Sequence, residues 1–511
     1  MCPSSTSTDG TPSATEERSP TEARGLELVS SGLPGLDEIL GGGLLAERAY
    51  LVRGGPGAGK TILGWHFLSA AEQPDAPLFV TFGEPTDQLV TNAEALGFHT
   101  GEVEFLDLSP NSAFFTEHGS YDIFPPSEVE RGPATEKIVT LIEEHEPRRI
   151  FVDSMTQFRY LASAPEQFRK QSQAFLRFLK EQGATVLLTS ESTPEAPDDD
   201  LQFGSDGIIS LALDDQRRSL AVTKFRGGDF QKGSHSLEIG DAGMTVYPRL
   251  APSLDRDEFD GETISSGVPE LDELLDGGLD RGTITIISGP SGAGKTTLGL
   301  QFMNEAAGRG ERSVLYNFEE ENETLIHRCE NLNIPVSSMI ERGTLSLTHR
   351  HPWDFLADRF TRTIRREVEE RDAGLIMIDS LTGLEHALGE RTLTQYLHTL
   401  GKYLVDRNVT FLLINETRKI TGEFQATESD ISYLADNLLF LRYLEMQGRM
   451  RKAIGVLKKR TGDFEKSLRE FRITEYGIKV GEPLTGLRDI LRGTPEWIDA
   501  EESDPIRETR S

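Results

Sequence analysis

The 511-residue chain has little cysteine, no long apolar run and no excess of basic residues. Its cysteines are Cys2, in a polar N-terminal stretch, and Cys329, in a helix-like segment, so we expect no structural disulfide and a reducing cytoplasm. No apolar run approaches the roughly 18 residues of a membrane-spanning helix, and we expect no membrane contact.

The scarcity of basic charge excludes another class of partner. Lys and Arg together number 53 against 84 Asp and Glu, a net charge of −31. A general nucleic-acid-binding protein needs a basic surface, so nucleic acid is not an expected partner. The acidity fits a solvated, self-repelling surface in an ordinary or a salt-rich cytoplasm.

What the chain does contain is a glycine-rich loop between a strand-like and a helix-like segment. Residues 283–287 are apolar, residues 289–296 form the loop, and a helix is expected from Thr297. This is the context of a P-loop, in which glycines let backbone N–H groups approach phosphate oxygens. Lys295 can reach the β- and γ-phosphates of ATP, and the Thr296 hydroxyl can ligate Mg²⁺. The expected glycine ligands are Gly289, Gly292 and Gly294.

A second copy of this pattern lies in the first half of the chain. Lys60 and Thr61 close a loop that follows the apolar run 49–52. Upstream, residues 30–37 match residues 265–272 at the same offset as the two P-loops. The chain is therefore interpreted as a tandem duplication of one nucleotide-binding domain. The expected glycine ligands in this copy are Gly54, Gly57 and Gly59.

The duplication divides the chain into five parts. Residues 1–24 are polar and lack an apolar centre, which predicts a disordered tail rather than a secretory signal. The remaining parts are a first domain over 25–250, an acidic linker over 251–262, a second domain over 263–485, and a C-terminal loop with an acidic tail over 486–511.

Apolar strand-like segments alternate with helix-like segments in both domains. They predict an α/β fold, with a mainly parallel sheet covered by helices on both faces and sites at the C-terminal ends of the strands. Residues 109–135 are interpreted as a long loop, and the acidic run 198–200 as a solvated loop. The strand through residue 224 is expected to close the first domain. The buried strands are expected at 77–82, 149–153 and 185–190, and at 313–318, 374–379 and 410–415.

Two of these strands end in aspartate. Asp153 and Asp379 each follow an apolar run directly, which is typical of a Walker B carboxylate that holds Mg²⁺ through water. The alternative is an aspartate that caps the next helix.

A pair of glutamates ends the strand before the second Walker B segment. Glu319 is the carboxylate expected to activate water or a hydroxyl, with Glu320 beside it. Adjacent strand residues point to opposite faces, so only one can aim at the phosphate; the alternative is that both are surface acids. In the first domain Gly83 stands in place of Glu319 and Glu84 in place of Glu320. That domain is predicted to bind ATP but to hydrolyse it slowly, unless Glu84 substitutes.

At these residues the chain resembles the KaiC family, double-domain ATPases and autokinases of the cyanobacterial clock within the RecA-like superfamily. The likeness spans roughly residues 25–500 and includes two Lys-x-Arg endings. It implies tandem RecA-like domains in a homohexameric double ring, with ATP between protomers. The Lys-x-Arg residues would then reach a neighbour's γ-phosphate in trans; the alternative is ordinary surface bases. The endings are Lys224 with Arg226, and Lys458 with Arg460.

The resemblance also implies an autophosphorylation site. The family's adjacent Ser-Thr pair matches Ser432 and Tyr433 here, and a tyrosine hydroxyl lies too far from its backbone for the same phosphate geometry. Ser432 is the expected acceptor, with Thr427 behind it. Residues 487–495 resemble the family's C-terminal loop, but the short acidic tail does not support a KaiA-like partner. KaiB-like or histidine-kinase-like signalling proteins are the partners implied.

Three functions compete at this point. The first is an ATPase and serine/threonine autokinase that uses ATP and Mg²⁺ and signals through the conformation of a ring. The second is an ATP-bound switch or scaffold without kinase activity. The third is a RecA/RadA-type DNA-dependent ATPase, against which the acidic balance and the lack of an appended basic module argue.

Overall fold

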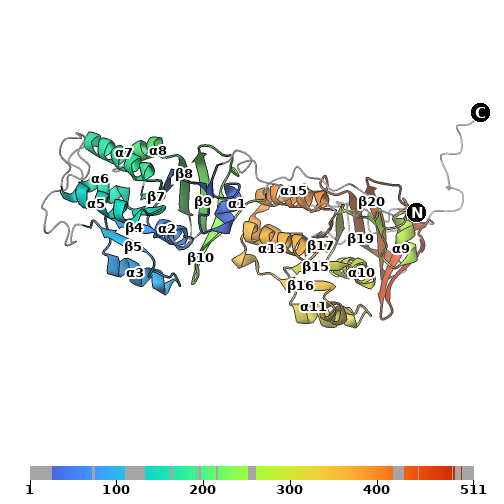
Figure 1. Ribbon diagram of the computed structural model, residues 1–511. Coiled ribbons are helices and arrows are strands. Elements are labelled where there is room, and N and C mark those ends of the chain that lie inside the picture. The colour runs from blue at the N-terminus through green and yellow to red at the C-terminus, as the bar shows by residue number, and fades with distance from the viewer. Residues whose placement is uncertain are drawn as a thin grey trace, which may run out of the picture. The chain divides into compact units, whose positions relative to one another are not determined.

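The computed structural model describes residues 26–71, 75–109, 133–161, 165–191, 193, 197–214, 217–250, 261–417, 431–446, 448–485, 487–488 and 496–497. The expected N-terminal tail, Thr427, and most of the expected long loop, linker and C-terminal segment lie outside these residues. The chain divides into two compact units between Arg249 and Leu250 (Figure 1). Among the described helices, none has both the length and the apolar character needed to cross a bilayer.

The first unit is built on one nine-stranded sheet. Its strands are β3 (Ala49–Arg53), β4 (Leu78–Thr81), β5 (Glu104–Asp107), β6 (Arg149–Asp153), β7 (Thr185–Ser190), β8 (Gly207–Asp214), β9 (Arg217–Phe225), β10 (His235–Gly240) and β11 (Gly243–Tyr247). They lie in the order β11-β10-β9-β8-β3-β7-β6-β4-β5. Neighbours from β8 to β5 are parallel, and neighbours from β8 to β11 are antiparallel.

Helices of the first unit connect the parallel strands, as crossover connections require. They are α2 (Lys60–Ser69), α3 (Thr86–Ala95), α5 (Pro133–His145), α6 (Met155–Leu161), α7 (Pro165–Glu181) and α8 (Asp199–Gly204). A short lead-in segment comes before the sheet and contains β1 (Leu28–Val29), α1 (Pro34–Ile39) and β2 (Leu44–Leu45).

The second unit repeats this plan with its own nine-stranded sheet. Its strands are β14 (Ile284–Gly289), β15 (Arg312–Asn317), β16 (Leu345–His349), β17 (Ala373–Asp379), β18 (Thr410–Glu416), β19 (Asn437–Met446), β20 (Arg449–Lys459), β21 (Arg469–Thr474) and β22 (Gly477–Pro483). The order is β16-β15-β17-β18-β14-β19-β20-β21-β22. Pairs from β16 to β19 are parallel, and pairs from β19 to β22 are antiparallel.

The longer helices of the second unit are α10 (Lys295–Gly308), α11 (Asn322–Glu330), α13 (Ala357–Glu369), α14 (Leu381–Leu388) and α15 (Glu390–Asp406). Shorter elements are β12 (Thr263–Ile264), α9 (Pro269–Leu274), β13 (Leu279–Asp280), α12 (Val336–Glu341) and the 3₁₀ turn η2 (Pro352–Asp354). Two further short strands, β23 (Leu487–Arg488) and β24 (Glu496–Trp497), pair with each other.

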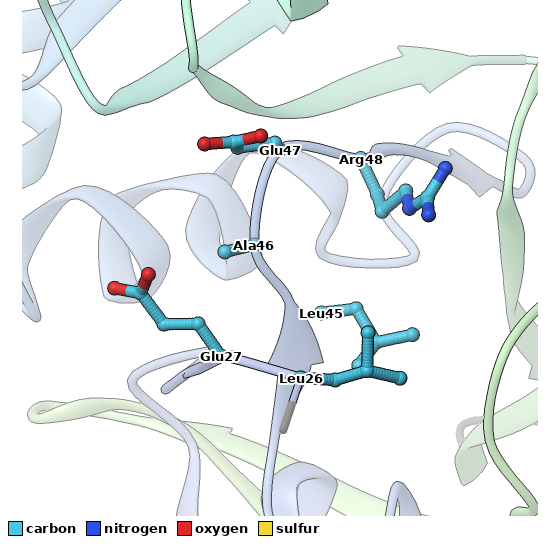
Figure 2. A pocket seen from close by; sticks show the side chains of 6 residues that line it. All are labelled: Leu26, Glu27, Leu45, Ala46, Glu47 and Arg48. Atoms are coloured by element: carbon cyan, nitrogen blue, oxygen red, sulfur yellow. The ribbon is translucent and has the colours of Figure 1, made fainter. Parts of the chain in front are cut away.

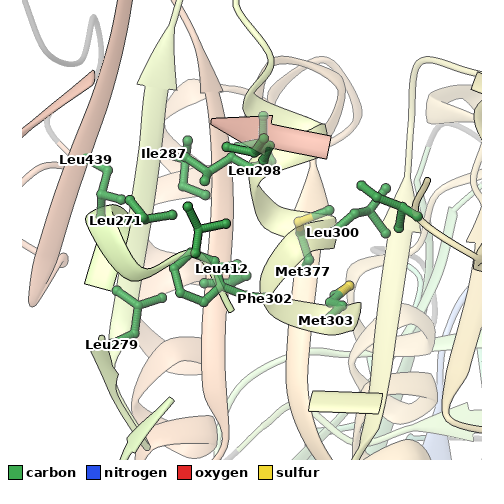
Figure 3. Close-up of a cluster of buried hydrophobic side chains, with 14 of the residues drawn as sticks. Leu271, Leu279, Ile287, Leu298, Leu300, Phe302, Met303, Met377, Leu412 and Leu439 are labelled. Carbon is green, nitrogen blue, oxygen red and sulfur yellow. The ribbon is translucent and has the colours of Figure 1, made fainter. Parts of the chain in front are cut away.

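Each sheet buries both faces, which explains the unbroken apolar runs of its central strands. In β18, Leu412 and Ile414 belong to a cluster with Leu298 and Phe302 of α10, part of which Figure 3 shows. The alternate residues of β18 belong to a separate cluster that includes residues of α15. The predicted α/β class, with two tandem RecA-like domains, is confirmed.

The matched lead-in segments form the same brace in both units. Ser30 Oγ donates to Asp37 Oδ2 at 2.6 Å, and the backbone N–H of Ser31 donates to Asp37 Oδ1 at 2.8 Å. Ser265 and the backbone of residue 266 donate to Asp272 at the same two distances. The repeated serine and aspartate therefore fix the chain at the start of α1 and α9, a structural role.

The acidic run 198–200 is not the solvated loop that the sequence predicts. Asp198 is buried and precedes α8, which begins at Asp199. Its carboxylate accepts two hydrogen bonds from the Arg53 guanidinium, both at 3.0 Å. Arg53 ends β3 with most of its side chain covered, and a covered guanidinium needs a counter-charge. The sequence therefore predicted a surface acidic cluster where Asp198 in fact forms a buried ion pair.

Each sheet also extends beyond the strand expected to close it. The hairpin β10–β11 continues the first sheet past β9, and β21–β22 continues the second past β20. These hairpins pack near the P-loops, so they matter for the site.

Candidate functional site

Both P-loops lie at the C-terminal end of a central parallel strand, followed at once by a helix. Gly59 and Gly294 are the residues before α2 and α10, with φ of 104° and 109°. A Cβ atom on Gly294 would lie 2.4 Å from Ile473 Cδ1 in β21, and one on Gly59 would lie 2.8 Å from Ile239 Cδ1 in β10. The positive φ favours glycine at both positions, and the side-chain ends of the extra hairpins would have to shift to admit a Cβ.

The P-loop lysines are buried and folded over their loops. Lys60 Nζ donates to the carbonyl oxygens of Gly54 at 2.9 Å and Gly55 at 3.0 Å. Lys295 Nζ donates to the Pro290 carbonyl at 2.9 Å. Burial lowers the pKa of both ammonium groups, and nearby carboxylates act in the opposite direction. Each loop therefore surrounds one desolvated positive charge, which a phosphate group would complement.

A hydroxyl and a carboxylate meet at the first turn of each P-loop helix. Thr61 Oγ1 donates to Asp153 Oδ2 at 2.7 Å, and Thr296 Oγ1 donates to Asp379 Oδ2 at 2.6 Å. The aspartates come from β6 and β17, two strands away from the P-loop strand in each sheet. Oxygen donors of this kind suit Mg²⁺.

The two aspartates differ in their second oxygen. Asp153 Oδ1 accepts a hydrogen bond of 2.5 Å from Thr189 in β7. In the second unit the equivalent position of β18 is Ile414, which cannot donate. The two positions are equivalent because Thr189 pairs with Val52 and Ile414 pairs with Ile287, the matching residues of the two P-loop strands. Burial raises the pKa of Asp379 to about 6, Thr296 lowers it and Glu319 raises it further. A divalent cation would offset this crowded negative charge, so the donor set fits Mg²⁺.

The two glutamates after β15 point to different partners. The Ser380 hydroxyl donates to Glu319 Oε1, which places Glu319 beside the end of β17. Glu320 instead pairs with Arg328 of α11, Nη2 to Oε2 at 2.8 Å. Asn317 Oδ1 accepts the backbone N–H of both residues, at 3.1 and 3.2 Å. Ser380, the residue after Asp379, therefore holds Glu319 close to the oxygens predicted to bind Mg²⁺, and the charge of Glu319 raises the pKa of Asp379.

In the first unit the backbone register identifies the missing carboxylate. The N–H of Phe82 donates to the Asp153 carbonyl at 2.8 Å, as the N–H of Phe318 does to the Asp379 carbonyl at 2.7 Å. Gly83 therefore occupies the place of Glu319. Glu84 follows it and is exposed.

The Lys-x-Arg residues of the first unit lie at the N-terminal end of the parallel strands, whereas the P-loop lies at their C-terminal end. Phe225 pairs with Gly207, which pairs with Tyr50 near the start of β3. Lys224 Nζ donates to the Gln202 carbonyl at 2.6 Å. The Arg226 guanidinium is exposed, 3.9 Å from Asp206.

The second unit has the same arrangement, with Ser432 included. Lys458 Nζ donates to the carbonyls of Ala435 at 2.6 Å and Ser432 at 3.2 Å. Arg460 Nη2 donates to the Tyr433 carbonyl at 2.8 Å. This group lies at the start of β14, while the P-loop follows its end about 17 Å away, at 3.3 Å per residue. Ser432 is exposed.

A hollow of about 330 Å³ lies near the start of β3 (Figure 2). Residues 26–27 and 45–48 line it, with the charged groups of Glu27, Glu47 and Arg48 around two leucines. It lies near the N-terminal end of β3, away from the P-loop, so it is separate from the residues predicted to bind nucleotide.

Several residues that hold the site together belong to no motif in the sequence. Ser380 positions Glu319, Arg328 holds Glu320, and Thr189 bonds to Asp153. One signal was available: a serine follows the Walker B aspartate in both units. The partners on other strands and helices leave no local pattern.

Comparison with known proteins gives a consistent assignment. The sequence pattern of the family described as "ATPase: KaiC" matches residues 29–251 and again 264–485. Circadian clock protein KaiC3 of Synechocystis sp. is 29% identical over 502 residues, covering 95% of this chain and 98% of the relative. Circadian clock oscillator protein KaiC of Picosynechococcus sp. is 29% identical over 499 residues, with 94% and 95% covered. The protein of the same name from Synechococcus elongatus is 27% identical over 502 residues, with 95% of both covered. With two matches of the family pattern across most of its length, the chain belongs to the KaiC family of ATPases.

Proposed function

We propose that this KaiC-family ATPase binds ATP with Mg²⁺ at both P-loops, hydrolyses it in the second unit, and works as a homohexameric ring in which each site is completed by a neighbour. One observation carries the proposal. In each unit the P-loop lies at the C-terminal end of the central parallel strands, and the Lys-x-Arg residues lie at their N-terminal end.

The second unit has the residues for hydrolysis. Lys295 and the loop N–H groups would hold the phosphates, and Thr296 and Asp379 would hold Mg²⁺, which shields phosphate charge when bound. Glu319, fixed by Ser380, would orient water and accept its proton.

The first unit would bind without fast hydrolysis. It has the P-loop, Lys60, Thr61 and Asp153, but Gly83 provides no carboxylate. This observation also supports the second candidate function, in which the first unit holds ATP as a structural switch.

The position of the basic residues supports completion of the site by a second chain. Lys458 and Arg460 are anchored by backbone carbonyls at the N-terminal edge of the sheet. The Arg460 guanidinium pairs with Asp436 at 3.2 Å and is still half exposed, so it would exchange this carboxylate for the γ-phosphate at a neighbouring P-loop, as an arginine finger does.

Autophosphorylation at Ser432 is a further part of the proposal. Ser432 is exposed and its carbonyl contacts the Lys458 ammonium, so the acceptor lies beside the basic residues that would meet a neighbour's γ-phosphate. A phosphorylated ring would then signal to a KaiB-like or histidine-kinase-like partner.

The catalytic assignment is tested by Glu319→Gln against Glu320→Gln. We expect phosphate release by Glu319→Gln to fall by about 10²- to 10⁴-fold, the usual contribution of a positioned base, while Glu320→Gln falls less than about tenfold, since it acts through Arg328. Equal losses would contradict the division of roles.

Assembly is tested by mixing two inactive variants, Lys295→Ala and Arg460→Ala. If sites form between chains, mixed rings contain some intact sites and phosphate release recovers. If each chain completes its own site, the mixture stays as inactive as its parts.

The kinase step is tested with γ-labelled ATP. We expect label retained on the wild-type protein and lost in Ser432→Ala, with Ser429→Ala as the matched control. Hydrolysis of ATP without any label retained on the protein would contradict the kinase step and favour the switch or scaffold function.

A further inference from the structure

Two histidines and a glutamate gather beside the segment that begins with Glu319. The ligand atoms of Glu321, His349 and His351 all lie within 4.8 Å of one another. Within the described parts of the chain, no other trio of His, Cys, Asp or Glu side chains lies this close. We propose that these residues bind a divalent transition-metal ion, with Zn²⁺ the best fit.

The backbone places both histidines on one side of the chain. His349 ends β16 and pairs with Asn317 of β15, and His351 follows in extended conformation with φ −85° and ψ 130°. Residues two apart in an extended segment share a face. Their rings lie 4.6 Å apart between centroids. In an extended segment the intervening Arg350 lies on the opposite face from the two histidines, and its Nε is buried.

The spacing suits a small ion. His349 Nδ1 lies 3.3 Å from Glu321 Oε2. Zn–N and Zn–O bonds of about 2.0–2.1 Å place tetrahedral ligands about 3.3–3.4 Å apart. The His349 side chain is only 14% exposed and therefore fixed, whereas that of Glu321 is 72% exposed and can adjust. His351 would close the third position, and water the fourth.

The donor set selects the class of metal. Neutral imidazole suits Zn²⁺, Cu²⁺ and Ni²⁺, whereas Mg²⁺ prefers oxygen ligands in octahedral geometry. This site would therefore be chemically distinct from Thr296 and Asp379.

The first unit offers an internal comparison. Asp107 stands in place of His349, because it pairs with Thr81 as His349 pairs with Asn317. Pro85 stands in place of Glu321, because each residue directly precedes the next helix. Proline cannot be a side-chain ligand, so the expected stoichiometry is one ion per chain. Bound metal would join the end of β16 to the residues that follow Glu319, and so restrain that segment.

The experiment uses the full chain without a polyhistidine tag, stripped with a chelator and held in excess Mg²⁺ without nucleotide. Zn²⁺ uptake is measured by equilibrium dialysis, and Co²⁺ uptake by the visible absorption of low-coordinate cobalt. We expect one ion per chain. His351→Asn and Glu321→Gln should each weaken Zn²⁺ binding by more than about tenfold, since even an outer partner of a metal ligand contributes that much. His398→Asn, an exposed histidine of α15, is the matched control and should bind normally.

The proposal is overturned if His351→Asn and Glu321→Gln bind Zn²⁺ as tightly as wild type. It is also overturned if wild type takes up no more than a His349→Asn/His351→Asn double variant. In either case the three residues form only a surface ion pair and a ring contact. Circular dichroism of each variant checks that the fold is retained.

Discussion

The sharpest difference between the two units is one position, Gly83 against Glu319. We predict that Gly83→Glu restores hydrolysis to the first unit. The change is made in a Glu319→Gln background, so that the activity of the second unit is suppressed. The new carboxylate would lie next to Ser154, as Glu319 lies next to Ser380.

The structure allows the side chain and sets the size of the effect. A Cβ on Gly83 would lie 3.4 Å from Gln157 Cγ, its nearest neighbour, and the backbone there is not left-handed. A well-placed base contributes about 10²- to 10⁴-fold. The remaining atoms of the glutamate must be accommodated beside Gln157 and the geometry will be imperfect, so we expect less than this full contribution, about 10- to 100-fold. That is about 1.4–2.7 kcal/mol of barrier.

The assay is steady-state phosphate release at saturating ATP, with Gly83→Gln in the same background as the control of equal size without the charge. Nucleotide content per chain is measured in parallel. If both variants bind nucleotide normally and Gly83→Glu is no faster than Gly83→Gln, the missing carboxylate is not what limits the first unit.

Three further predictions concern the described contacts. Burial raises the pKa of Asp379 from 3.8 to about 6, so between these pH values the nucleotide-free folded chain holds a proton that the unfolded chain releases. The contribution of this group to the free energy of unfolding is therefore highest below about pH 4. It falls by up to about 3 kcal/mol as the pH rises through 6. Denaturant unfolding in chelator from pH 4 to 7 should show this trend in wild type and not in Asp379→Asn. Asp198→Ala should destabilise the first unit by about 3 kcal/mol, because it removes the buried carboxylate that pairs with the largely covered Arg53 guanidinium. Exposed Asp199→Ala should change the unfolding free energy by less than about 0.5 kcal/mol; thermal melts that rank the two variants equally would contradict the ion-pair argument. Gly294→Ala should weaken nucleotide binding by the second unit without unfolding it, because a φ of 109° is strained for alanine and the Cβ would also displace the tip of Ile473; normal ATP binding in a filtration assay would show that the loop adapts.

The sequence predicted the features that local pattern determines. β6 and β7 have the bounds expected for them, 149–153 and 185–190, because a short apolar run between polar residues marks a buried parallel strand. The alignment of Gly83 with Glu319 agrees with the backbone register around Phe82 and Phe318. Duplication helped, since each unit served as a control for the other.

What the sequence did not reveal depends on partners far apart in the chain. Asp198 looks like part of a surface acidic run until Arg53, 145 residues earlier, is seen beside it. The His349 and Glu321 group likewise joins the ends of separate elements. No local pattern predicts that the hairpin β10–β11 packs over Gly59, because this contact forms only in the folded chain.

Because β14 separates the two groups of residues, the proposed ATPase activity per chain should depend on protein concentration. The residues proposed to hold phosphate follow one end of β14, and those proposed to reach a neighbour's phosphate lie at the other end. If each site forms between two chains as proposed, dilution would separate the two halves of every site at once. Turnover per chain should then rise steeply with protein concentration and level off once every protomer has two neighbours.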